Sequence, residues 1–110
     1  MTLWHRTLSG ERWATFSASK QVLMIGTELM RGQRWQELGD DEEARRSSER
    51  ALELIDLTVA DNRWRGKRVS LLRLRESLAE AYLNPREKPF RVLYERSLEL
   101  ASTGHDLDPG

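Results

Sequence analysis

Residues 40–60, DDEEARRSSERALELIDLTVA, decide the fold of this chain. Asp40 suits the N-cap of a helix, and the acids that follow it suit the first turn, where the helix dipole favours negative charge. Apolar side chains then recur at helical spacing and predict one buried face, formed by Ala44, Ala51, Leu52, Ile55 and Val59. The stretch therefore predicts an amphipathic helix over about 41–60.

Three further stretches have the same helical periodicity. They predict helices over about 12–38, 65–83 and 88–102. Gly39 is expected to end the first of them, Pro85 to stop the next, and Gly104 to stop the last. The first helix is long, and weak helix formers around Ser17 favour a break there as the alternative. Met24 and Met30 of this helix are expected to fill the core.

The predicted helices form one domain. A chain of 110 residues has the usual size of a single domain, and we assign 1–110 to it. Every predicted connection is short, and short links favour antiparallel neighbours. The sequence therefore predicts an all-α fold, an antiparallel (up-down) four-helix bundle. Residues 1–9 and 104–110 are expected to be flexible flanks.

The composition limits the classes of partner and the location. Charged residues make up 33% of the chain, but eighteen cations balance eighteen acids, which argues against attraction of the whole molecule to nucleic acid or to an anionic membrane. The chain has no cysteine, which fits a reducing compartment. The N-terminal stretch MTLWHRTLSGER lacks the apolar core of a signal peptide. We therefore expect a cytoplasmic protein without a membrane partner.

The stretch 63–75, RWRGKRVSLLRLR, is the most unusual part of the surface, with six cations and no acid. It falls where a helix is expected to begin, and cations are disfavoured at that end. One interpretation is a binding site for an anion or an acidic partner. The competing interpretation is local compensation by Asp61, by the tail acids Asp106 and Asp108, and by the carbonyl groups that end the preceding helix. The candidate binding residues are Arg63, Trp64, Arg65, Lys67 and Arg68.

In an up-down bundle the two poles differ in charge. The basic residues of 63–68 share the first pole with Trp13, whereas Trp35 and the acids of 40–43 lie at the opposite pole. Opposite charges at the two poles favour self-association. The alternative is that the tryptophans close the ends of the bundle with apolar surface. The secondary interface candidates are Trp13, Trp35, Asp40, Asp41, Glu42 and Glu43.

Side chains that could carry chemistry are few. The two histidines, His5 and His105, have no carboxylate at ligand spacing, and neither a nucleophile–base pair nor a glycine-rich phosphate loop occurs. We therefore expect no enzyme, no metal and no cofactor. Glu28 interrupts an apolar stretch, and it is expected to pair with Arg31 at the surface; the alternatives are a buried polar contact or an acid that faces a ligand.

Small and aromatic residues recur over 32–51, at Gly32, Trp35, Gly39, Ala44 and Ala51. This stretch resembles part of a tetratricopeptide repeat, in which small residues let paired helices approach and an aromatic ring fills the wedge. The resemblance covers about one repeat, and about three are needed for a stable solenoid. We interpret the stretch as a helical hairpin that uses the same packing.

Two functional hypotheses follow from the sequence. The first is a small non-enzymatic helical bundle that acts through protein–protein interaction, as a homodimer. The second is a nucleic-acid or nucleotide-binding helical module that uses the cluster at 63–68 as the partner of a separate enzyme.

Overall fold

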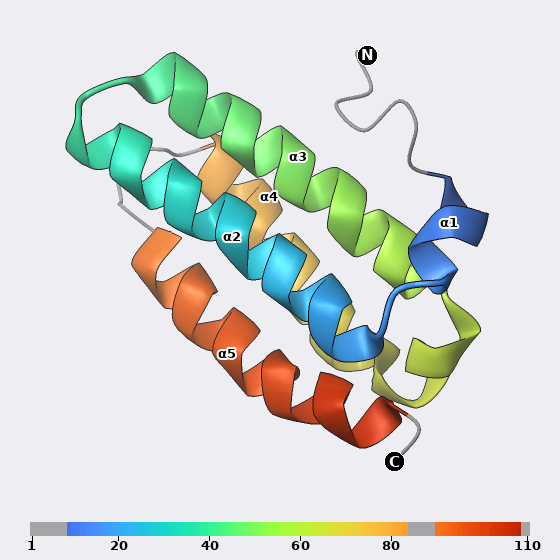
Figure 1. The fold of residues 1–110 in the computed structure, drawn as a ribbon. Helices are drawn as coiled ribbons and strands as arrows, with labels where there is room; N and C mark the ends of the chain where they lie inside the picture. The colour runs from blue at the N-terminus through green and yellow to red at the C-terminus, as the bar shows by residue number, and fades with distance from the viewer. Residues whose placement is uncertain (1–8, 84–89, 109–110) are drawn as a thin grey trace.

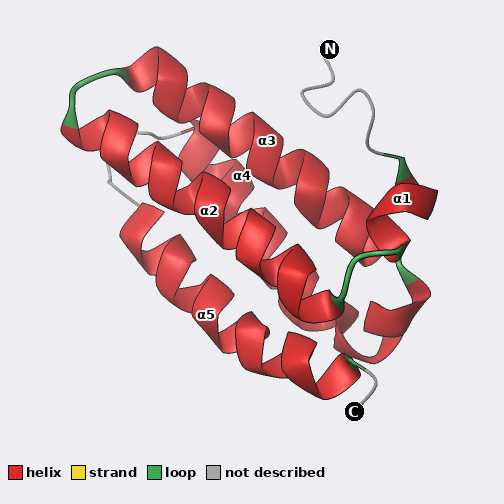
Figure 2. Cartoon of the chain, in the orientation of Figure 1, coloured by secondary structure: helices red, strands yellow, loops and turns green. Residues whose placement is uncertain are grey.

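The computed structural model describes residues 9–83 and 90–108, and every regular element in these two ranges is a helix (Figure 2). The elements are α1 (Gly10–Ala14), α2 (Ala18–Glu37), α3 (Asp41–Val59), the 3-10 helix η1 (Asn62–Lys67), α4 (Arg68–Leu83) and α5 (Phe90–Leu107).

The four long helices form an antiparallel bundle. The central helix α2 packs against α3 on one side and α5 on the other, and α4 closes the ring behind them (Figure 1). The prediction of an all-α four-helix bundle is therefore confirmed. The predicted stop at Pro85 and the predicted start at 88 lie outside the described residues.

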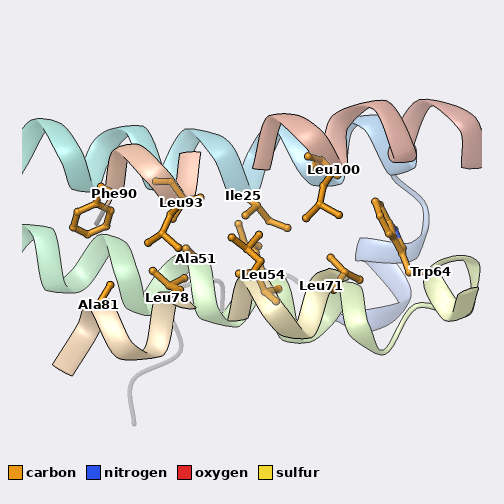
Figure 3. Packing of buried hydrophobic residues seen from close by; sticks show 14 of the residues in the cluster. Ile25, Ala51, Leu54, Trp64, Leu71, Leu78, Ala81, Phe90, Leu93 and Leu100 are labelled. Atoms are coloured by element: carbon orange, nitrogen blue, oxygen red, sulfur yellow. The ribbon is translucent and has the colours of Figure 1, made fainter. Parts of the chain in front are cut away.

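One apolar core runs the length of the bundle. Figure 3 shows Phe90 at one end of the core and Trp64 at the other, with the aliphatic side chains between them. The predicted apolar face of α3 contributes Ala51 and Ile55, and both are fully buried. The other large side chains that are almost completely buried are Trp13, Ile25, Leu29, Leu54, Leu71, Leu78 and Leu93.

The predicted helix over 12–38 is two helices, so the alternative of a break near Ser17 is confirmed. The side-chain oxygen of Ser17 accepts a hydrogen bond from the backbone N–H of Lys20 at 3.1 Å and thereby caps α2. Ser9 caps α1 in the same way through the N–H of Arg12, also at 3.1 Å. Each serine satisfies a backbone donor that a new helix leaves unpaired, so the break is stable.

Gly104 does not end the last helix, and that prediction is wrong. The helix α5 continues to Leu107 and passes Gly104 where its backbone approaches the first turn of α2. A Cβ atom at Gly104 would lie 3.0 Å from the carbonyl oxygen of Ala18. The glycine is therefore needed for a close approach of two backbones. Residues 1–8 and 109–110 of the expected flanks lie outside the described residues.

Asp108 ties the end of α5 to the start of α2. Its carboxylate accepts hydrogen bonds from the backbone N–H of Ala18 at 2.6 Å and from the hydroxyl of Ser19 at 2.7 Å. The Ser19 hydroxyl and the backbone N–H groups lower the pKa of Asp108 by stabilising its charged form.

The segment that resembles one tetratricopeptide repeat forms the α2–α3 hairpin. Gly39 ends α2 with a φ of 78°, which a side chain with a Cβ atom rarely adopts. A Cβ atom at Gly32 would lie 2.3 Å from the ring of Phe90 in α5. The helical-hairpin interpretation is therefore confirmed, but the small residue at position 32 makes room for α5.

Candidate functional site

Trp64 lies inside the protein. The stretch 62–67 forms η1 ahead of α4, and this turn directs the indole into the end of the core, where it is fully buried (Figure 3). Its Nε1–H donates a hydrogen bond to Oε1 of Gln21 at 2.8 Å. The expectation that Trp64 contributes to an exposed binding site is therefore wrong, because no face of the ring is accessible to a partner.

Gln21 connects the elements that meet at this pole. Its side chain is fully buried, and its Nε2 donates to the carbonyl oxygen of Trp13 at 2.9 Å and to Oδ2 of Asp61 at 2.9 Å. Trp13 is also fully buried, and its Nε1–H donates to Oγ1 of Thr58 at 3.0 Å. The two tryptophans therefore close the end of the bundle, which was the alternative to an interface role.

Asp61 compensates the first arginine of the basic stretch. Its Oδ2 accepts from Nη2 of Arg63 at 2.7 Å, and its Oδ1 accepts from the backbone N–H of Arg63 at 3.0 Å. Burial alone would raise the pKa of Asp61, but the hydrogen bonds from Arg63 and Gln21 outweigh it and lower that pKa to about 2. The same hydrogen bond, which Arg63 donates to the Asp61 carboxylate, raises the pKa of Arg63.

We expect this carboxylate to give the fold a measurable acid sensitivity. Because the pKa of Asp61 falls from 3.8 to about 2 on folding, Asp61 stabilises the fold above pH 4, and this contribution is lost as the pH falls through about 2. The contribution is about 2 kcal/mol. Urea denaturation at a series of pH values should show a smaller loss of stability on acidification for Asp61→Asn than for the wild type. Parallel pH profiles for the two proteins would contradict the assignment.

The remaining cations of the stretch differ in their surroundings. Nε of Arg68 donates to the carbonyl oxygen of Val59 at 3.0 Å, so this arginine serves the end of α3. Arg65 and Lys67 are exposed, and neither has a hydrogen-bond or ion-pair partner among the described residues. Local compensation thus accounts for Arg63 and Arg68, whereas Arg65 and Lys67 remain open to solvent.

Most acids at the opposite pole already form hydrogen bonds or ion pairs within α3. Asp40 caps α3 by accepting from the backbone N–H of Glu43 at 3.1 Å. Glu42 and Glu43 both pair with Arg46, and only Asp41 is an exposed acid without such a described partner. Contact between the two poles of different copies would therefore gain little from charge. Trp35 at this pole is half-buried against the core.

Glu28 is buried, with 5% of its surface exposed, and links two helices. Its carboxylate accepts from Nε of Arg50 on α3 at 2.7 Å and from Nη1 of Arg31 at 2.7 Å. The predicted pair with Arg31 therefore exists, but as part of a buried polar contact that the sequence left as the alternative.

An apolar face that the candidate residues did not include lies along the side of the bundle. Three side chains on it are more than half exposed: Leu23 at 69%, Met30 at 53% and Leu98 at 53%. They border a groove of about 210 Å³ between α2 and α5, the two helices that lie side by side in Figure 1. Met30 is therefore not core filler. The residues that line the groove, the α2–α5 face, are Ser19, Val22, Leu23, Gly26, Thr27, Met30, Tyr94, Ser97, Leu98 and Ala101.

Comparisons with models of known protein families, with curated proteins and with solved structures found no match. Within residues 9–83 and 90–108, no three histidine, aspartate or glutamate side chains come together in a way that could hold a metal ion. In the same part of the chain, no helix has both the length and the apolar character to cross a membrane.

Proposed function

We propose that this chain is a non-enzymatic helical bundle that acts through protein–protein interaction, as a homodimer, in the cytoplasm. The observation that carries the proposal is the α2–α5 face, where Leu23, Met30 and Leu98 stand exposed around one apolar groove. Scattered single apolar residues are normal on a protein surface, but several around one groove are typical of an interaction site.

The energy available at this face supports stable association. Complete burial of one leucine or methionine side chain contributes about 1.5–3 kcal/mol, and three such side chains meet here. The polar poles offer less, because most of their charges are already paired within one copy. The interaction surface that we propose therefore lies along the side of the bundle.

The nucleic-acid alternative is left with a smaller set of residues. Trp64 is buried and cannot stack on a base, and Arg63 and Arg68 serve the protein's own backbone and Asp61. Arg65 and Lys67 remain, and two cations neutralise too few phosphates for tight binding at physiological salt. We therefore favour the homodimer.

We expect a charged residue at the centre of the face to separate the copies. The wild type should appear in light scattering as a species of about twice 12.8 kDa. Leu23→Glu should weaken dimerisation at least tenfold, because a carboxylate would have to be buried in an apolar contact. Leu72→Glu is the matched control: Leu72 is 47% exposed on α4, away from the face, and its replacement should leave the dimer intact. A wild type that stays monomeric at high concentration would contradict the proposal.

A further inference from the structure

The outer surface of α2 carries a hole of the kind that receives one side chain from a facing helix. Leu23, Gly26, Thr27 and Met30 lie at i, i+3, i+4 and i+7, and all four line the groove. Four residues at this spacing form the hole in knobs-into-holes packing. We call these four residues the α2 hole.

Gly26 leaves the bottom of the α2 hole open. A Cβ atom built at Gly26 would meet Oγ of Ser97 at 3.4 Å and the ring of Tyr94 at 3.7 Å, which are ordinary contact distances. The glycine is therefore not forced by a clash with the neighbouring helix, in contrast to Gly32 and Gly104. Gly26 is itself buried, but it lines the groove beside Ser97 and Tyr94, so a larger side chain at this position would extend into the groove.

A knob of suitable size stands on the opposite side of the same groove. Leu98 of α5 follows Ser97, the residue nearest to Gly26, and so lies level with the α2 hole along the bundle. With 53% of its surface exposed, Leu98 does not fill the hole of its own chain. The face thus presents both an exposed leucine and an open hole.

We propose that Leu98 of one copy fills the α2 hole of a second copy, about a two-fold axis that runs along the groove between α2 and α5. This inference rests on the proposed homodimer and specifies its geometry. Rotation about such an axis places α5 of each copy on α2 of the other, so the knob and the hole are each used twice. A self-complementary surface of this kind is what a closed dimer requires.

The charges of the two helices favour this axis over one that crosses them. The helix α2 has three cations and two acids, whereas α5 has two arginines and three acids. Packing of α5 on α2 of the second copy brings helices of opposite net charge together. A crosswise axis would place α2 on α2 and set like charges against each other.

A larger side chain at position 26 would fill the α2 hole from its own chain and exclude Leu98 of a second copy, so this substitution tests the proposed packing. Gly26→Met should occupy the α2 hole and raise the dimer dissociation constant at least tenfold in sedimentation measurements, although it adds apolar surface. Gly26→Ala adds only one methyl group and should change this constant less than threefold. Circular dichroism should show an unchanged helix content for both variants. If Gly26→Met dimerises like the wild type while Leu23→Glu is monomeric, the homodimer stands and the knob-and-hole packing is overturned.

Cross-linking provides a second test that does not depend on Gly26. The chain has no cysteine, so each cysteine that is introduced reports one position. A mixture of Thr27→Cys and Leu98→Cys proteins should give disulfide-linked heterodimers, because the proposed packing brings these positions together, whereas disulfides do not bridge Cα atoms more than about 7 Å apart. Neither protein alone, nor a mixture of Leu72→Cys with Thr27→Cys, should cross-link. Cross-linking of Thr27→Cys with itself would show that α2 packs on α2 and would overturn the proposed axis. If the wild type is dimeric but the mixture of Thr27→Cys and Leu98→Cys does not cross-link, the proposed axis is also overturned.

Discussion

Replacement of Trp64 by alanine is expected to lower the free energy of unfolding by about 3–5 kcal/mol. The indole is fully buried at the end of the core, so its removal deletes a large apolar contact and leaves a cavity at this end of the bundle. It also leaves Oε1 of Gln21 buried without its donor. Small domains are stable by only about 5–15 kcal/mol, so this one change should remove a large part of the total.

Two further variants separate the parts of this effect. Trp64→Phe keeps much of the apolar volume but cannot donate to Gln21, and should cost about 1–3 kcal/mol. Trp35→Ala removes an indole that is only half-buried and should cost less than Trp64→Ala. Urea denaturation of the three variants in a Leu23→Glu background would measure unfolding apart from any dimerisation. A loss below about 1 kcal/mol for Trp64→Ala would contradict the role of this residue as the closure of the core.

The helix content, the start of α3 and the alternative of a break near Ser17 were predictable because their causes are local. The acids after Asp40 and the side chain of Ser17 act within one turn of the residues that they cap. The apolar periodicity of 41–60 likewise lies within one helix. The role of Gly104 depends on Ala18, which is far away in the sequence. No local pattern distinguishes a glycine that ends a helix from one that allows such a close approach.

The surface was harder to predict than the core, for the same reason. The interpretation of the basic stretch as locally compensated agrees with the contacts of two residues, because Asp61 pairs with Arg63 and the end of α3 accepts a hydrogen bond from Arg68. The position of Trp64 depends on Gln21, which is remote in the sequence and has no pattern that identifies it as a buried partner. Leu23 and Met30 belong to a broad apolar stripe on α2. Only the positions of the neighbouring helices show which part of a broad stripe is left uncovered.

We expect Arg50→Met to lower the free energy of unfolding by about 3 kcal/mol. Arg50 reaches from α3 to the buried carboxylate of Glu28, and its own side chain is only 18% exposed. Its removal leaves the charge of Glu28 inside the protein with Arg31 as its described ion-pair partner, and Arg31 is 59% exposed. Arg31→Met is the matched control and should cost less than about 1 kcal/mol, because water screens an exposed partner.

The double variant Glu28→Met with Arg50→Met separates the energy of the pair from the penalty of breaking it. Two buried charges lose their hydration on folding, so their mutual attraction gives little net stability, and an apolar replacement of both is often neutral or stabilising. We therefore expect the double variant to be more stable than Arg50→Met alone and within about 1 kcal/mol of the wild type. Denaturation of all four proteins of this cycle gives the coupling energy directly. Additive losses would mean that Glu28 and Arg50 stabilise the α2–α3 contact independently, and this would contradict the role of Arg50 as the partner of the buried Glu28 charge.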